Sequence, residues 1–288
     1  MIRASLAAVL LAIPFATQAQ GLPFHTESAL TTAFEERGLR AFTMVGRRGD
    51  ATTVTTPLVI LPWAPHHRVT TRVVVPLVHK RFETTGSSYS QTGLGDVALA
   101  IKWAFHVRDR PSGTTRLAVV ASGTLPTGST GATFENGMLA PPQRQLGKGT
   151  ATLGAALAGT IIRGRWGLNF DVGHARNGTH DGFQFGATTR YDVAIGFRIP
   201  DRVETIRTRT VQLYLEWNGV ITGRSEQGSI PVPNSGGHVA FLSPGVQWVV
   251  MPQLLLEGSI QIPVLQTYNG SQPSVGVRPA LGARFLFF

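Results

Sequence analysis

The chain has 288 residues, which is enough for one large all-β domain or two ordinary domains. Charged residues make up only 15% of it, against roughly 25% in soluble globular domains, and its 33 glycines and 18 prolines disfavour a helical bundle. The absence of cysteine excludes disulfides and thiol chemistry, and the net charge of +10 comes from Lys and Arg scattered singly, which disfavours a nucleic-acid site.

The N-terminus has the three parts of a secretory signal peptide. Arg3 supplies the positive charge, residues 4–15 form a short apolar core, and residues 17–19 (Thr-Gln-Ala) form a small-residue cleavage site. The alternative is an uncleaved membrane anchor. The core is too short for it, because a spanning helix needs about 20 apolar residues, and Pro14 interrupts the core. We therefore predict Sec export and cleavage after Ala19.

Later segments alternate apolar and polar side chains with the period of two that a β-strand requires. One set of alternating apolar residues comprises Val97, Leu99, Ile101, Trp103 and Phe105, and another comprises Val211, Leu213, Leu215 and Trp217. No segment after the signal peptide is apolar for long enough to form a transmembrane helix.

A water-soluble β-sandwich would give the same alternation, with its apolar face turned inward. Two features favour an outer-membrane barrel instead. The polar face is rich in Gly and Ala, which suits a crowded interior, and aromatic residues gather near strand ends, as in the girdles of such barrels. The chain also ends in an aromatic strand that finishes with Phe287-Phe288.

The pattern predicts an all-β fold, a transmembrane antiparallel up-and-down β-barrel of about 12 strands. The expected strands cover residues 38–46, 51–60, 67–79, 95–108, 114–125, 149–162, 165–175, 185–198, 207–218, 237–250, 252–262 and 274–287. Pro244 is expected to mark a bulge or bend, because proline cannot donate to a central ladder.

The lengths of the connections test this arrangement, because a barrel alternates short periplasmic turns with longer external loops. The expected external loops are residues 80–94, 126–148, 176–183, 219–236 and 263–273, and the expected periplasmic turns are residues 61–66, 109–113, 163–164, 199–206 and 251. Only the connection 47–50 is too short for an external loop, so the strand number could differ by two.

The expected organisation is a signal peptide (residues 1–19), an N-terminal segment (residues 20–37) and one barrel domain (residues 38–288). No composition shift marks a linker within the barrel. The sequence leaves open whether residues 20–37 plug the barrel or hang in the periplasm.

Histidines are the candidate metal ligands besides carboxylates. His66 and His67 fall at an expected periplasmic turn, where solvated interfacial residues explain them better than a metal site. A second group, which could hold a cation or a hydrolytic site, flanks an external loop and consists of Asp171, His174, His180 and Asp181. None of these histidines has the helical spacing and acidic partner of a known metal motif.

Nucleophilic and phosphate-binding chemistry is also poorly supported. Ser243 and Ser259 have no histidine placed to act as a base. Residues 93–96 (Gly-Leu-Gly-Asp) lack the following Lys and Ser or Thr and the helix of a phosphate-binding loop, and indicate a turn. We therefore predict no catalytic residues, no cofactor and no metal, and a protein that is not an enzyme.

Ten charged side chains fall on the polar face of the predicted strands, and we expect them to line the lumen. A charge on the lipid face would cost roughly 2–4 kcal/mol near the midplane. Side chains alone can fill a barrel of about eight strands, but a barrel of twelve strands encloses more space. The strand number therefore favours a narrow polar channel over a sealed, salt-bridged interior. The ten are Arg72, Lys102, Asp171, Arg190, Asp192, Arg198, Glu216, Glu257, Arg278 and Arg284.

Three stretches carry a family resemblance. They are residues 92–103 (TGLGDVALAIKW), residues 125–128 (LPTG), and residues 243–248 (SPGVQW) followed by residues 256–264 (LEGSIQIPV). Together they resemble the transporter-like outer-membrane barrels named for the meta-pathway of phenol degradation, over residues 92–288. The resemblance implies an outer-membrane protein that passes hydrophobic or aromatic compounds. The chain differs from the family pattern by one extra Phe at its end.

The predicted function is a passive outer-membrane channel for small, hydrophobic or aromatic solutes. The alternative is a non-transporting structural or adhesive barrel that acts through external loops such as residues 126–148. An enzymatic barrel, which would depend on His174, ranks third. The expected partners are outer-membrane lipid and lipopolysaccharide, the barrel-assembly machinery and a small-molecule solute, with no nucleic acid.

Overall fold

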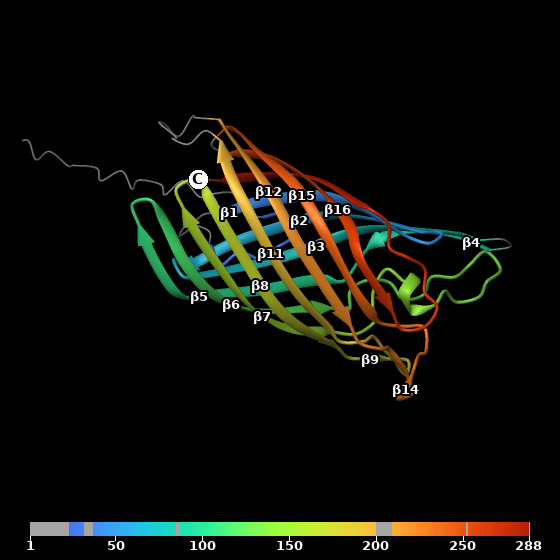
Figure 1. Ribbon diagram of the computed structural model, residues 1–288. Helices are drawn as coiled ribbons and strands as arrows, with labels where there is room; N and C mark the ends of the chain where they lie inside the picture. Colours follow the sequence, from blue (N-terminus) through green and yellow to red (C-terminus); the bar gives the residue numbers. More distant parts are fainter. Residues whose placement is uncertain (1–22, 32–36, 85–86, 200–208, 252, 288) are drawn as a thin grey trace, which may run out of the picture.

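The computed structural model describes residues 23–31, 37–84, 87–199, 209–251 and 253–287. One antiparallel sheet of 13 strands closes on itself, because β1 pairs with β17 at one seam and β2 with β3 beside it (Figure 1). The strand β4 pairs only with the outer part of β3. Twelve strands therefore form the closed barrel, which confirms the predicted fold and strand number.

The barrel strands match the twelve predicted ones in order, and most are longer. They are β1 (Arg37–Arg48), β2 (Ala51–His66), β3 (Val69–Thr84), β5 (Val97–Arg110), β6 (Gly113–Leu125), β7 (Thr152–Arg163), β8 (Trp166–Asn177), β11 (Thr188–Ile199), β12 (Thr210–Thr222), β15 (Gly237–Met251), β16 (Leu254–Tyr268) and β17 (Arg278–Phe287).

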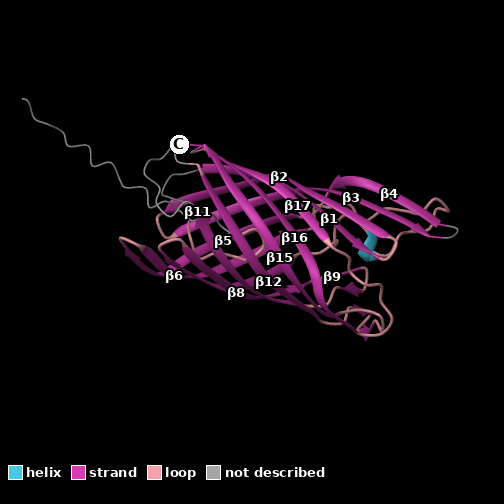
Figure 2. Cartoon of the chain, turned by 45° about the horizontal axis from the view of Figure 1, so that its top comes forward, coloured by secondary structure: helices cyan, strands magenta, loops and turns pink. Residues whose placement is uncertain are grey.

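The remaining elements gather at the end of the barrel opposite the C-terminus (Figures 1 and 2). They are β4 (Ser87–Leu94), the short 3₁₀ helix η1 (Pro142–Arg144), and a small sheet of β9 (Thr179–His180), β10 (Phe183–Gln184), β13 (Glu226–Gln227) and β14 (Ile230–Pro231). The connections that carry these elements lie at this end, which we call the external end. Within the described part of the chain, no helix has the length and apolar character needed to cross a membrane.

Alternation along the strands separates two faces of the barrel wall. In β5 the side chains of Leu99, Ile101 and Trp103 are exposed on the outside, whereas Ala100, Lys102 and Ala104 between them are buried. The pairs of neighbouring strands are in register over long runs, so the same division holds from strand to strand. The outer face is therefore apolar and the inner face polar or small, as a barrel in lipid requires.

Several expected connections differ from the structure. Residues 80–84 belong to β3, 87–94 to β4 and 263–268 to β16 rather than to external loops, and residues 61–66 belong to β2 rather than to a turn. The connection after β1 is only the turn Gly49-Asp50, in which Gly49 has a φ of 56° that suits glycine. This exception to the loop rule does not change the strand number.

Pro244 causes no bulge. It keeps register with Leu215 of β12, and the irregularities of β15 lie between Ala240 and Phe241 and between Val249 and Met251. Its carbonyl accepts a hydrogen bond from Ser259 Oγ (3.1 Å), so the strand loses only the donor that proline lacks.

Candidate functional site

Residues 23–31, which we call the lumen segment, contact inward-facing side chains from most of the barrel wall. Their described partners come from β1, β3, β5, β6, β7, β8, β12 and β17, so the segment lies inside the ring of strands. Small inner residues make room for it, since Ala29 packs against Ala104, Ala118 and Ala158. The abundance of Ala on the inner face thus has a direct packing reason.

Glu216 of β12 binds the first part of the lumen segment. Its carboxylate accepts hydrogen bonds from the backbone N–H groups of Phe24 (2.8 Å), His25 (3.1 Å) and Thr26 (2.8 Å), and from the Thr26 hydroxyl (2.8 Å). The Glu216 side chain is 0% exposed. A carboxylate taken out of water needs such donors, and three successive N–H groups form a concave anion site.

Glu27, the next residue along the lumen segment, makes contacts of the opposite charge. Its carboxylate forms ion pairs with Lys102 of β5 (2.7 Å) and Arg72 of β3 (2.7 Å). The Lys102 ammonium also donates to the carbonyls of Ser28 (2.5 Å) and Leu30 (3.1 Å). The wall thus offers an anion to the backbone donors of the segment and cations to its single acidic side chain.

A second ion cluster holds the start of the segment. Glu257 of β16 pairs with Arg40 of β1 and Arg284 of β17, each at 2.6 Å. The same two guanidinium groups donate to carbonyls of the segment, Arg40 to Phe24 (3.2 Å) and Arg284 to Pro23 (3.4 Å). Both cations therefore bridge the wall and the lumen segment.

The other predicted lumen residues lie around these contacts. Asp171 accepts the Glu27 N–H (2.8 Å), and Arg190 lies between Asp171 (3.8 Å) and Asp192 (3.3 Å). Arg198 is near the periplasmic end of β11, opposite Gln212 in register. Arg278 lies at the start of β17 on the external side, over the Phe241 ring at 4.8 Å. The structure therefore brings eight of the ten close to the lumen segment or its partners, and places Arg198 and Arg278 toward opposite ends of the barrel.

Sequence reasoning missed several members of this interior. Arg40 lies at an inward-facing position of the expected strand 38–46, so the alternation of that strand could have identified it. Gln212 and Gln247, each 1% exposed, also fill the interior, but they are uncharged, and the expected lumen residues are all charged. Glu27 could not be found, because no periodicity relates residues 23–31 to the wall.

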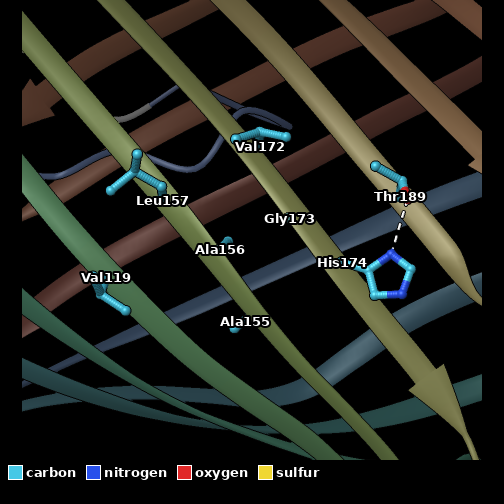
Figure 3. A pocket seen from close by; sticks show the side chains of 8 residues that line it. All are labelled: Val119, Ala155, Ala156, Leu157, Val172, Gly173, His174 and Thr189. Atoms are coloured by element: carbon cyan, nitrogen blue, oxygen red, sulfur yellow. Dashed lines mark hydrogen bonds between the residues drawn. The ribbon is translucent and has the colours of Figure 1, made fainter.

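The histidine cluster considered from the sequence does not form. His174 lies on the outer face of β8 and is hydrogen-bonded to Thr189 (2.9 Å; Figure 3). Asp171 faces inward, toward the lumen segment. His180 instead approaches Asp181 (3.4 Å) at the external end. Among the described residues, no three His, Asp or Glu side chains converge on a point where a metal could bind.

The surface around His174 is a shallow hollow of about 380 Å³ above the small residues Ala155, Ala156 and Gly173 (Figure 3). Its rim residues Val119 and Leu157 belong to the exposed apolar outer face. The hollow therefore opens toward lipid, and the polar site of the molecule is its interior.

Comparison with known proteins agrees with this architecture. The family model described as "Putative MetA-pathway of phenol degradation" matches residues 55–267. The fold is similar to that of the COG4313 outer membrane channel from Pseudomonas putida, with a TM-score of 0.69 at 11% identity, covering 93% of this chain and 100% of that one. At this identity the likeness shows the fold alone, that of an outer-membrane β-barrel.

Other solved barrels are more distant. The NanC porin gives a TM-score of 0.46 at 9% identity, covering 86% of this chain and 98% of that one. The β-domain of the Bordetella autotransporter Brka gives 0.46 at 11% identity, covering 88% and 99%. Neither likeness is close enough to carry an argument. No curated protein sequence matches the chain.

Proposed function

Because the chain belongs to the family of the MetA pathway of phenol degradation, we propose that it is a passive outer-membrane channel for small, hydrophobic or aromatic solutes. One observation carries the proposal: a closed barrel of twelve strands has an inner wall of charged and polar side chains beneath an apolar outer face. Such an interior suits a water-filled passage, and twelve strands enclose more space than their own side chains need. The proposal assigns no residue a catalytic role.

In this proposal the lumen segment is the element that closes the passage. Its bonds to Glu216, Lys102 and Arg284 span the interior. Water would replace these bonds if the segment moved, so each contributes only about 1–3 kcal/mol to keeping it in place. In this proposal, the passage of solute requires the segment to give up these bonds while the barrel stays folded.

The proposed setting is the outer membrane, reached by Sec export and cleavage after Ala19. Outer-membrane lipid and lipopolysaccharide would cover the apolar outer face, and the barrel-assembly machinery would insert the chain. The aromatic C-terminal strand β17 is consistent with that route, since Phe285 and Phe287 lie exposed on its outer side.

Solute influx into proteoliposomes tests the proposal. We would compare the mature chain with a variant lacking residues 20–31, and measure the influx of benzoate and of a pentose of similar size. The truncated barrel should admit solute at least about tenfold faster, because its interior loses the segment, and benzoate should enter faster than the pentose. A chain lacking only residues 20–22 keeps the lumen segment and serves as the control.

The heat-modifiable gel shift would show that each variant is folded. If the folded truncated barrel admits neither solute, the channel proposal is wrong. The second candidate, a structural or adhesive barrel, would then be preferred, because the buried Gln212, Glu216 and Gln247 already fill part of the interior. Deleting residues 126–148 separates the two: a channel keeps or increases its influx, whereas an adhesive protein loses its partner.

A further inference from the structure

A second cavity, of about 340 Å³, lies at the external end of the barrel. We call it the vestibule. Its wall is the inner face of β2, β3 and β6, with Thr53, Val78 and Thr124, and its roof is residues 142–148 of the connection between β6 and β7. The volume falls in the range of about 300–1,000 Å³ that is typical of small-molecule sites.

The roof of the vestibule is held by its own hydrogen bonds. The Gln145 amide nitrogen donates to the carbonyls of Ala132 (3.0 Å) and Ala140 (2.6 Å), and its amide oxygen accepts from the Ala132 N–H (2.9 Å). Asp96 accepts the N–H groups of Gly128 (3.0 Å) and Lys148 (2.9 Å). A site whose polar groups are already bonded in place binds a ligand without first having to order a loop.

Two ammonium groups line this cavity, those of Lys80 and Lys148. Lys80 donates to the carbonyls of Gln143 and Gln145, and Lys148 donates to Asn177 Oδ1 (2.8 Å) and to Thr152 Oγ1 (3.3 Å), so each ammonium has two partners. In the part of the chain that the structure describes, neither forms an ion pair with a carboxylate. Each ammonium has three N–H groups, so donors are left for an anion.

A hydroxyl group also lines the cavity that contains the two ammonium groups. The Thr124 hydroxyl is buried and has no hydrogen-bond partner among the described residues. Burial lowers the pKa of Lys148, although the nearby Asp96 opposes this shift, so a bound anion would stabilise its charged form.

Apolar residues line the cavity beside polar ones, which include Thr53, Thr55, Asp96 and Gln145. Pro76, Val78, Leu146 and Phe185 face the same space, and the Lys148 ammonium lies 5.9 Å from the centre of the Phe185 ring. A ligand that fits this combination has one negative group and a flat or compact apolar body.

From this geometry we infer that the vestibule binds small aromatic monocarboxylates, with the carboxylate at Lys148 and Lys80 and the ring against Val78, Leu146 and Phe185. A role for this site in uptake rests on the proposed function. Binding to the vestibule does not depend on the proposed function, because the vestibule lies on the external side of the lumen segment and is formed while that segment is in place.

Titration calorimetry on the refolded mature chain in detergent tests the inference. Benzoate should bind, while benzyl alcohol, which has the ring without the charge, and acetate, which has the charge without the ring, should each bind at least about tenfold more weakly. Lys148→Met and Lys80→Met should each weaken benzoate binding about tenfold or more. Arg176→Met is the control: it removes a cation on the outer face of β8, away from the vestibule, and should leave benzoate binding unchanged.

Equal affinity for benzoate and benzyl alcohol, or unchanged benzoate binding in both folded Lys variants, would overturn the inference, as would no binding at all. The result is separable from that of the influx experiment. Benzoate binding without influx into any barrel would leave the vestibule site in place and refute the channel. Influx of benzoate without saturable binding would support the channel and refute the vestibule site.

Discussion

Single buried carboxylates decide how the interior is filled. Glu216 and Glu27 face opposite partners: the first is on the wall and binds backbone donors of the lumen segment, while the second is on the segment and binds cations of the wall. Neither charge could remain in the interior unpaired, because burying an ionised carboxylate without partners costs several kcal/mol. The wall and the segment therefore depend on each other at these two residues.

Glu216→Gln should weaken the binding of the lumen segment to the wall. The amide keeps the size of the side chain but turns one acceptor into a donor facing the N–H groups of Phe24, His25 and Thr26. Loss of charge-assisted bonds of about 1.5–3 kcal/mol each should speed hydrogen exchange of these amides by on the order of 10- to 100-fold. Exchange followed by mass spectrometry on the folded protein measures this directly.

Glu135→Gln is the matched control, because Glu135 is exposed on the external loop and does not touch the segment. Its exchange pattern over residues 23–31 should equal that of the parent. Unchanged protection of these residues in the Glu216 variant would mean that other contacts hold the segment and that this carboxylate does not.

At the scale of elements, tight contacts between glycine and an aromatic ring hold neighbouring strands together on the outer face. Gly219 of β12 lies opposite Tyr191 of β11, and a Cβ at Gly219 would come within 2.1 Å of the Tyr191 ring. The Tyr191 hydroxyl is hydrogen-bonded to His238 Nε2 (2.7 Å) on β15, so the ring cannot move without breaking that bond. Three consecutive strands are therefore joined at this point.

Gly219→Ala should lower the free energy of unfolding by about 1–3 kcal/mol, because the methyl group displaces the Tyr191 ring and its hydrogen bond. Tyr191→Phe, which removes only the hydroxyl, should cost about 0.5–1.5 kcal/mol. Chemical denaturation in detergent measures both. Gly131→Ala is the control, since nothing lies within 4 Å of its added Cβ. An equal loss at Gly131 and Gly219 would contradict this account.

The strands could be predicted from the sequence because lipid and lumen select opposite side chains with a period of two. The alternation around Leu99, Ile101 and Trp103 follows from these two environments, because the apolar side chains face lipid and the residues between them face the lumen. The strand ends were less predictable, since β3 leaves the bilayer region and pairs with β4 through polar residues that are ordinary in loops as well. The effect of Pro244 could not be predicted either. The sequence shows that proline lacks a backbone N–H, but it does not show whether the strand register shifts there.

The site was predictable only in part, for a related reason. Parity assigns Lys102 or Glu216 to the inner face but does not say what each one meets there. Their partners belong to residues 23–31, a segment of irregular backbone without a repeating pattern. The roof of the vestibule, tied by Gln145 and Asp96, likewise depends on contacts between residues distant in sequence.

At the scale of the whole molecule, the outer face carries an aromatic girdle at its periplasmic end. Trp166 begins β8 and touches Phe197 near the end of β11, with ring centroids 4.6 Å apart. Trp63 and Phe287 are both register partners of Arg37, so they lie at the same level. Aromatic rings of this kind mark the boundary between lipid tails and headgroups, which fixes the height of the barrel in the bilayer.

The five tryptophans should therefore report two depths. All five are exposed on the outer face, but Trp217 and Trp103 lie in the middle of β12 and β5, whereas Trp63, Trp166 and Trp248 lie toward the periplasmic end. Lipids brominated at mid-chain should quench a fluorescence component that Trp217→Phe reduces, and lipids brominated near the headgroup should quench one that Trp166→Phe reduces. Mid-chain quenching that is reduced by Trp166→Phe and unchanged by Trp217→Phe would show that the barrel sits at a different height, with its periplasmic girdle buried among the lipid tails.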